Sequence, residues 1–176
     1  MQYLANNNLL LRALEPEDLE ILYRWENDTE LWQYGSTLTP YSRFTLRDYI
    51  NNSLQQDIFQ SRQLRLMITE KTSAKTLGTI DLYDFDPIHQ RAGVGILIDK
   101  DFHRRNYGFQ SLELIKQYTS KVLNLHQLYA YIPKNNEASY RLFLKSGFSE
   151  SGLLKSWIKT ENDFEDVWCV QKIFNL

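Results

Sequence analysis

The sequence has few of the features that mark disulfide scaffolds, metal sites or membrane spans. Cys169 is the only cysteine among 176 residues, so no internal disulfide can form and no cysteine metal motif exists. The histidines His89, His103 and His126 do not have the spacing of metal ligands, and we expect no metal. No apolar run in the sequence reaches the roughly 18 residues that suggest a membrane span.

The chain also lacks an excess of charge of either sign. Its 20 basic and 22 acidic side chains leave a formal charge of −2, which is not the electrostatic surface of a non-specific nucleic-acid-binding protein. Residues 1–8 contain no basic stretch followed by an apolar core, so we expect no signal peptide. These absences favour a cytoplasmic protein that binds neither nucleic acid nor membrane.

What the sequence does have is the composition of a globular protein. Apolar residues make up 43% and charged residues 24%, and no repeat or linker divides the chain, so we expect one domain, residues 1–176. Periodicity predicts strands at 9–14, 63–69, 76–85, 92–98, 128–132, 153–159 and 167–174, with helices opening at 15–18 and covering 44–54, 109–123 and 136–146. This mixed order predicts an α/β or α+β fold with a helix-covered sheet.

Three local features refine this prediction. The strand at 92–98 is almost continuously apolar, which predicts burial on both faces. Asn136 is expected to cap the helix that follows it, and Gly147 to stop that helix in a left-handed conformation. The polar segment 84–90 contains Pro87 and is expected to form a turn.

The most informative segment is the basic loop from His103 to Gly108, between the strand at 92–98 and the next helix. A helix N-terminus offers unpaired N–H groups and a partial positive charge, and arginine adds charge-assisted contacts to phosphate oxygens. Glycine and asparagine tolerate the left-handed backbone that aims successive amides at one anion. The loop therefore predicts a phosphate-binding cradle, although a solvated basic turn fits the same residues equally well. A nucleotide-binding domain is disfavoured, because the sequence has no Walker or dinucleotide glycine pattern.

Residues 91–148 resemble the cofactor-binding core of the GNAT acyltransferases. Their loop pattern is Arg or Gln, two residues, Gly, one residue, then Gly or Ala, at a strand-to-helix junction. In this chain His103 stands in the position of the Arg or Gln, and Asn106 stands in the position of the first Gly. The second half of that core follows as a strand, Asn136 with Ser139 three residues later, Leu142 and Gly147-Phe148. The layout from residue 11 onward is similar to the branch that contains spermidine acetyltransferases and ribosomal-protein N-terminal acetyltransferases.

This resemblance implies a mixed, mostly antiparallel sheet with splayed strands and helices on both faces. It implies an N-acetyltransferase that moves an acetyl group from acetyl-CoA, its co-substrate, to a primary amine by direct attack in a ternary complex. The acceptor would be a polyamine-like molecule or a protein N-terminus, and the enzyme could be a homo-oligomer. A non-catalytic CoA-binding or regulatory module is the alternative. Phe143 stands where many GNAT enzymes have Tyr, and Gly93 where polyamine-type relatives have Glu.

The resemblance also assigns cofactor contacts. The loop would hold the CoA pyrophosphate, the strand backbone would pair with pantetheine as a neighbouring strand would, and Asn136 would contact the pantetheine arm. Asn136 could also serve only as a helix cap, or do both. The expected cofactor residues are Ile96, Leu97, Ile98, His103, Arg104, Arg105, Asn106, Tyr107, Gly108, Phe109, Asn136 and Phe143.

Acyl transfer to an amine requires a base or a water chain that removes the amine proton and a donor for the oxyanion, and an acid can supply a proton to the departing thiolate. Asp84 and Asp81 are the candidate bases, and Asp84 is preferred because we expect it at the strand end nearest the site. Tyr140 is a candidate acid if its helix turns it inward. Solvated strand carboxylates and a surface tyrosine are the structural alternatives.

The acceptor is expected to bind to the N-terminal third of the chain. Glu30, Trp32 and Tyr34 are the candidates, because aromatic rings beside carboxylates can hold a cationic amine. They lie around residues 35–37, which we expect to be flexible. Core packing is the preferred interpretation for Trp25 and an equal alternative for Trp32.

Overall fold

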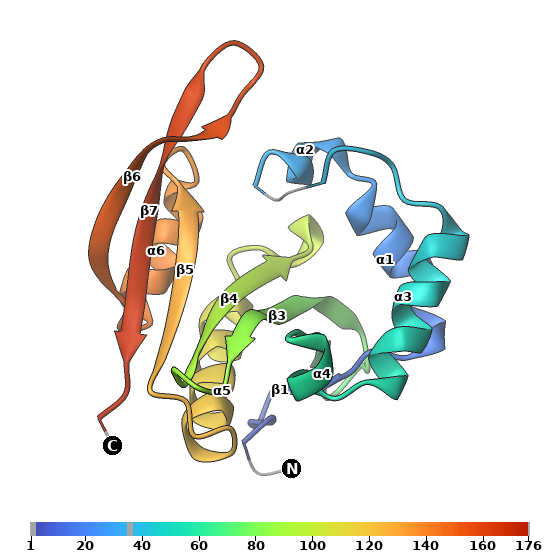
Figure 1. Ribbon diagram of the computed structural model, residues 1–176. Coiled ribbons are helices and arrows are strands. Elements are labelled where there is room, and N and C mark those ends of the chain that lie inside the picture. Colours follow the sequence, from blue (N-terminus) through green and yellow to red (C-terminus); the bar gives the residue numbers. More distant parts are fainter. Residues whose placement is uncertain (1–2, 35–36, 176) are drawn as a thin grey trace.

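The computed structural model describes residues 3–34 and 37–175, and its centre is one sheet of seven strands (Figure 1). The strands are β1 (Leu9–Ala13), β2 (Leu64–Glu70), β3 (Thr76–Asp86), β4 (Arg91–Ile98), β5 (Gln127–Pro133), β6 (Ser149–Lys159) and β7 (Phe164–Ile173). Their order is β1-β2-β3-β4-β5-β7-β6. Neighbouring strands are antiparallel except β4 and β5, which are parallel, so the predicted mixed, mostly antiparallel sheet is confirmed.

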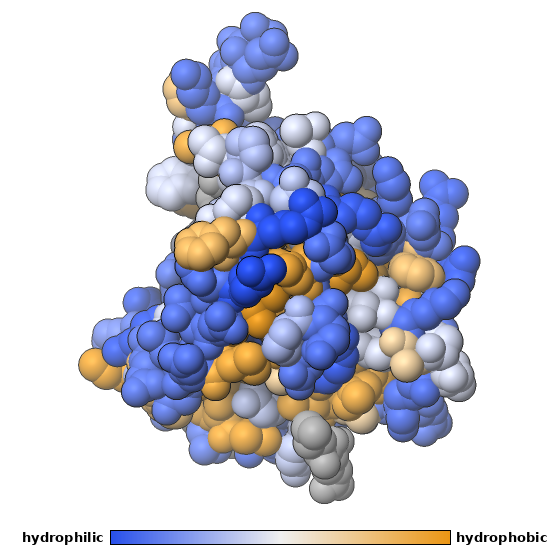
Figure 2. All heavy atoms as spheres, turned by 90° about the vertical axis from the view of Figure 1, so that its right-hand side faces the viewer, coloured by the Kyte–Doolittle hydropathy of each residue, from blue (hydrophilic) through white to orange (hydrophobic). Residues whose placement is uncertain are grey.

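Helices cover both faces of this sheet (Figure 1). They are α1 (Leu19–Glu26), α2 (Thr29–Trp32), α3 (Arg43–Gln55), α4 (Ile58–Ser61), α5 (Tyr107–Lys121) and α6 (Glu137–Lys145), with 3₁₀ helices at Pro16–Asp18 and Lys100–Phe102. Ile115 of α5 packs in one core cluster with Ile80 of β3. Leu22 of α1 and Ile50 of α3 pack with Met67 of β2 in a second cluster on the opposite face. The outward side of α1 and α3 is mostly hydrophilic (Figure 2), as expected for amphipathic helices.

The two four-residue helices, α2 and α4, are not predicted by the sequence pattern. Each is too short to show a helical apolar period, and each begins at an aspartate cap, Asp28 or Asp57, that accepts backbone N–H bonds. Two expected features are confirmed: Asn136 caps α6 by accepting from the Ser139 amide, and Gly147 has a φ of 81°. The turn expected at 84–90 begins later, because β3 continues to Asp86.

The feature that positions the site is the divergence of β4 and β5. In the described chain these strands pair only where Arg91–Gly93 meets Gln127–Tyr129, although β4 continues to Ile98 and β5 to Pro133. We call the gap between their later residues the fork. The splayed strands implied by the resemblance are therefore confirmed. The expected burial of the whole strand on both faces is wrong for its second half, since residues 95–98 border the fork and are only half-buried.

Hydrogen bonding to β3 decides which backbone groups of β4 face the fork. The Asp99 amide donates to the Leu77 carbonyl at 2.8 Å. Antiparallel alternation then directs the backbone groups of Leu97 towards β3, and those of Ile96 and Ile98 towards the fork. The expected backbone contact of Leu97 with pantetheine is therefore wrong, whereas the orientations of Ile96 and Ile98 are suited to it.

Candidate active site

The loop between β4 and α5 forms a hollow of about 350 Å³. Asn106, with a φ of 62°, precedes the helix in the left-handed conformation expected from its residue type. The first α5 amide bonded to a carbonyl of this turn is that of Gln110, which donates to Asn106. The amides of Tyr107, Gly108 and Phe109 precede this bond and lie at the hollow, where they can bind an anion. The hollow is lined by Ile98, Phe102, His103, Arg104, Asn106, Tyr107, Gly108, Phe109, Leu142 and Lys145.

Two of the expected loop side chains contact other residues of the protein rather than pointing freely into the hollow. The His103 Nε2 lies 2.7 Å from the Ile98 carbonyl and donates to it, so this ring folds back onto β4. The Arg105 guanidinium lies 5.7 Å from the centre of the Phe102 ring, and Arg105 is not part of the hollow's lining. Arg104 does line it, with a φ of 61°.

Lys145 is a cation in the hollow that sequence reasoning missed. It comes from the last turn of α6, and its Nζ lies 5.0 Å from the centre of the Phe109 ring. A lysine at a helix C-terminus has an ordinary explanation in the helix dipole, so the sequence contains no signal that marks it as a phosphate ligand.

A larger cavity, of about 630 Å³, passes through the fork. Asn136, Ser139 and Leu142 of the α6 segment line one side, and Leu22 and Glu26 of α1 line the other. Because α6 and α1 lie on opposite faces of the sheet (Figure 1), the cavity passes the open edge of β4 from one face to the other. It borders the hollow at the start of α5, which we call the phosphate hollow after the role expected of its loop. The two cavities share Ile98, His103, Arg104 and Leu142.

Three charged side chains form an ion cluster in the wall of this cavity. Arg65 of β2 contacts Glu26 at 2.6 Å and Asp81 at 2.7 Å, and all three side chains are at most 24% exposed. Burial opposes the charge of Arg65, but Asp81, Tyr49 and Glu26 together raise the pKa of its guanidinium above the ordinary value. The cluster therefore has two carboxylates for one cation, an excess of one negative charge.

Sequence reasoning named Asp81 but missed this arrangement. The available signal was Arg65, a charged residue between Leu64 and Leu66 in an alternating strand. Its partner Glu26 lies on a separate helix, and only the packing of α1 on the sheet joins them.

The acceptor candidates are partly brought together. Trp32 and Tyr34 line the cavity, and the Trp32 indole donates to the Glu26 carbonyl at 2.8 Å. Glu30 instead lines an adjacent hollow of about 480 Å³. Trp25 is 6% exposed and donates to Asp99, so the preferred core interpretation is confirmed. Residues 35 and 36 of the expected flexible stretch lie outside the described residues.

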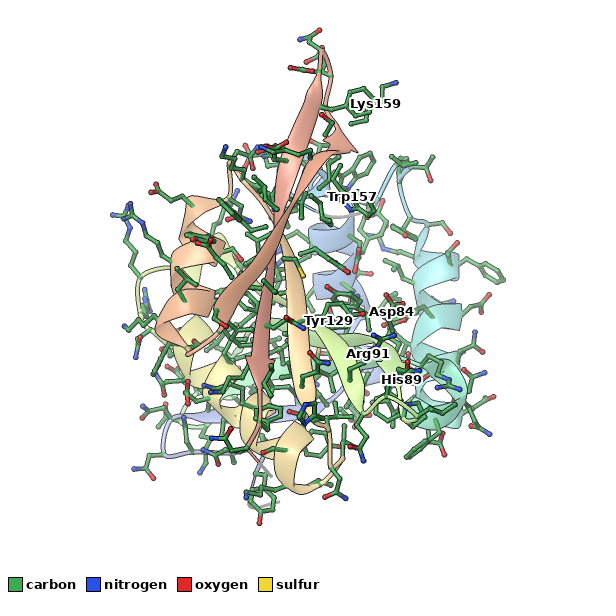
Figure 3. The ribbon with its side chains drawn as sticks, turned by 60° about the vertical axis from the view of Figure 1, so that its left-hand side comes forward. Asp84, His89, Arg91, Tyr129, Trp157 and Lys159 are labelled. Carbon is green, nitrogen blue, oxygen red and sulfur yellow. The ribbon has the colours of Figure 1, made fainter. Side chains whose placement is uncertain are left out.

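The preferred position of Asp84 is wrong. Since β3 and β4 are antiparallel, Tyr83 pairs with Gly93 and Asp86 with Arg91, at the start of β4 rather than at its end. Asp84 is exposed and lies near Arg91 and the β3–β4 turn (Figure 3). It therefore does not border the fork cavity.

Two expected residues of α6 point away from the cavity. The Tyr140 hydroxyl donates to Glu150 and its ring stacks on Trp168 at 5.6 Å, so the inward orientation required of an acid is not adopted. Phe143 is 2% exposed and packs against Phe148 at 4.9 Å, so its expected cofactor contact is wrong. Leu142 lines the cavity instead, because one residue turns the side-chain direction by about 100° in an α-helix.

Within residues 3–34 and 37–175, no group of three or more His, Cys, Asp or Glu side chains could hold a metal ion. The helices of the described chain are also too short or too polar to cross a membrane. A hollow at the start of a helix, an open strand edge and an anionic cavity beyond it fit the class of acyl-CoA-dependent acyltransferases that act on amines.

Comparison with known proteins identifies the family. Residues 8–149 match the model of the acetyltransferase (GNAT) domain, so the chain belongs to the GNAT acetyltransferase family. It is 26% identical to spermidine N(1)-acetyltransferase of Escherichia coli over 148 residues, which cover 84% of this chain and 76% of the relative. The spermidine N(1)-acetyltransferase of Vibrio cholerae is 25% identical over 162 residues, 92% of this chain and 91% of the relative.

The fold matches a crystal structure of spermidine N-acetyltransferase from Vibrio cholerae in complex with CoA and spermine. The TM-score is 0.85 at 23% identity, and the match covers 96% of each chain. The chain is thus an N-acetyltransferase with acetyl-CoA as co-substrate, and the catalytic interpretation is confirmed over the non-catalytic module.

Proposed function

We propose that the acceptor of this enzyme is a polyamine, acetylated on a primary amine. The cluster of Glu26, Arg65 and Asp81 carries this proposal, because its excess negative charge lies in the cavity that opens through the fork. Trp32 and Tyr34 add aromatic surface that binds cations. The names of the relatives above support a polyamine, and none of them is named for a protein N-terminus. We propose the cytoplasm as its compartment, because the free Cys169 gives no sign of an oxidising one.

Acetyl-CoA would enter from the α5 side of the sheet. Its pyrophosphate would bind the amides of Tyr107, Gly108 and Phe109, with Arg104 and Lys145 supplying positive charge. Its pantetheine would follow the open edge of β4, where Ile96 and Ile98 direct their backbone groups to the fork. The Ile98 carbonyl already accepts from His103, so the Ile96 groups and the Ile98 amide are the ones offered.

The acceptor would approach from the α1 side, which brings both substrates together in one complex. An alkylammonium group has a pKa near 10 (about 10.4 for lysine), so it must lose a proton before it attacks. Its nitrogen then adds to the thioester carbonyl, the oxyanion collapses, and the C–S bond breaks. The anionic cluster would hold the remaining ammonium groups of the polyamine, and Asp81 stays the candidate base on this side.

The test measures thiol release from acetyl-CoA with spermidine, spermine and a short peptide with a free N-terminus. We expect kcat/KM for the polyamines to exceed that for the peptide by about 100-fold, because only the polyamines bring further cationic groups to the cluster. Glu26→Gln removes one charge and should raise the polyamine KM about tenfold, with the acetyl-CoA KM unchanged.

Glu20→Gln is the matched control, since Glu20 is an exposed α1 carboxylate paired with Arg43 outside the cavity. It should leave both KM values unchanged. A peptide acetylated as fast as spermidine would contradict the polyamine proposal, as would a Glu26→Gln enzyme with the wild-type polyamine KM.

We also propose that the enzyme forms homo-oligomers through the β6–β7 hairpin. This hairpin extends beyond the rest of the molecule (Figure 1). It exposes 61% of Trp157 (Figure 3) and 56% of Phe164, large aromatic surfaces that a partner subunit would bury. A dodecameric structure of the Vibrio cholerae enzyme, similar to this chain with a TM-score of 0.79, supports assembly.

Light scattering coupled to size-exclusion chromatography checks the assembly. Trp157→Ser should convert the main species to a smaller one, because it removes the largest exposed apolar group of the hairpin. Ile88→Ser is the control, since Ile88 is 82% exposed on the β3–β4 turn. A wild-type monomer, or an unchanged mass for Trp157→Ser, would contradict the role of the hairpin.

A further inference from the structure

A phenol closes the inner end of the fork. Tyr83 of β3 pairs through its backbone with Gly93, which is the last β4 residue paired with β5. A Cβ atom at Gly93 would lie 2.1 Å from the Tyr83 Cε2 and 2.3 Å from its Cζ, and a Cβ at Gly95 would lie 3.9 Å from Cε1. The ring therefore lies directly over the two glycines of β4, in the space that a side chain on Gly93 would occupy.

The ring lies beside the fork cavity, whose β4 lining ends at Gly95. Gly95 lines that cavity together with Ile96 and Ile98, and only a Cβ atom added to Gly95 would come within 3.9 Å of the Tyr83 ring. From Ile98 to Gly93 the strand covers five residues, about 16 Å at about 3.3 Å each. A pantetheine arm that runs along this edge from the phosphate hollow brings its sulfur towards Tyr83.

The surroundings of the phenol keep it protonated. Burial raises the pKa of Tyr83, the neighbouring Tyr129 and Tyr131 raise it further, and a hydrogen bond with the Tyr131 backbone opposes them only in part. The Tyr129 ring meets it edge-on at 6.0 Å. The protonated phenol therefore keeps an O–H that can donate a hydrogen bond.

The other hydroxyl that the sequence suggested as an acid is turned away. Tyr140 donates to Glu150, and position 143 is a buried phenylalanine without a hydroxyl. The chemistry still benefits from a proton donor, because the departing sulfur develops negative charge.

We propose that Tyr83 is the catalytic acid that protonates the departing CoA sulfur, an inference that rests on the proposed acetylation of an amine. The amine nitrogen bonds to the thioester carbon, and the C–S bond breaks as the carbonyl re-forms. The Tyr83 hydroxyl gives its proton to the sulfur, and CoA leaves as the thiol. The phenolate then takes, through water, the proton that the nitrogen loses on becoming an amide, so no net proton is gained or lost.

Tyr83→Phe tests this role, because it keeps the ring over Gly93 and removes only the hydroxyl. We expect kcat for acetylation of spermidine to fall about 100-fold, the lower end of what general acids contribute, with CoA affinity unchanged. A second readout needs no acceptor: ultraviolet absorbance of the thiolate follows ionisation of the CoA thiol in the binary complex. The pKa of the bound CoA thiol should rise by about one in Tyr83→Phe, because the thiolate loses a hydrogen-bond donor.

Tyr129→Phe is the matched control. It removes a hydroxyl from the adjacent ring, where burial and the nearby carboxylate of Asp84 raise the pKa of Tyr129 to about 12. We expect it to change neither readout by more than about twofold.

The two measurements, kcat for spermidine and ionisation of the CoA thiol, distinguish a failure of the Tyr83 proposal from a failure of the proposed acetylation of an amine. If Tyr83→Phe retains wild-type kcat, or loses kcat without any shift in thiol ionisation, the proposal is overturned. If the wild-type enzyme acetylates no amine, the proposed function fails, and thiol ionisation alone decides whether Tyr83 contacts the sulfur. An upward shift then still supports the contact, and an unchanged thiol refutes it.

Discussion

CoA binding should fall at least about 100-fold when Gly108 is replaced by glutamate. Gly108 lies in the first turn of α5, where its amide faces the phosphate hollow. A Cβ atom there would already lie 3.0 Å from the Leu142 Cδ2, so the longer side chain is forced towards the hollow. Its carboxylate would then compete with the pyrophosphate for the helix amides and repel it. Isothermal titration calorimetry with CoA measures the loss.

Gly108→Ala separates crowding from charge at this position. The only tight contact of its methyl group is with the flexible end of Leu142, and Ile98 lies at an ordinary 3.7 Å, so we expect less than about a fivefold loss of CoA affinity. Unchanged CoA affinity in Gly108→Glu would mean that the turn before α5 does not hold the pyrophosphate, and the cofactor site would have to lie elsewhere.

Replacing Arg65 with methionine should lower the free energy of unfolding by about 3 kcal/mol. Arg65 is 17% exposed and is the cation between Glu26 and Asp81. Methionine fills a similar volume but leaves two neighbouring carboxylates without a partner in the cavity wall, which is the costly way to break a buried ion cluster. Urea denaturation of the wild-type and variant proteins gives the difference.

Two control variants test whether unpaired buried carboxylates cause the loss of stability. The triple variant Arg65→Met, Glu26→Gln, Asp81→Asn removes all three charges and should recover part of the lost stability, since no uncompensated carboxylate remains. Arg43→Met breaks an exposed pair with Glu20 and should change stability little. Full wild-type stability of Arg65→Met would show that the cluster does not hold α1 to the sheet.

The cofactor half of the site could be predicted from the sequence because it is local. A strand, its loop and the helix that follows are contiguous, so the left-handed Asn106 and the amides at the start of α5 follow from residues 91–109 alone. The wrong predictions in this half concern the direction of the Leu97 backbone groups and of the Phe143 side chain. Phe143 lies one residue from Leu142, and that single step turns it from the cavity into the core.

The acceptor half could not be predicted in the same way, because its parts are distant in sequence. Glu26, Arg65 and Asp81 come from α1, β2 and β3, and their contacts depend on how the helix packs on the sheet. Asp84 was misplaced because the antiparallel pairing of β3 with β4 carries it away from the fork.

The sequence by itself determined the longer helices and strands, the GNAT resemblance and the left-handed turn before α5, since apolar period, capping residues and loop chemistry are properties of neighbouring residues. Only the tertiary structure decided what borders the fork. Sheet order and strand direction brought Arg65 to two carboxylates and placed the Tyr83 ring over Gly93. Such contacts join residues that no local pattern links, because packing of the whole chain sets them.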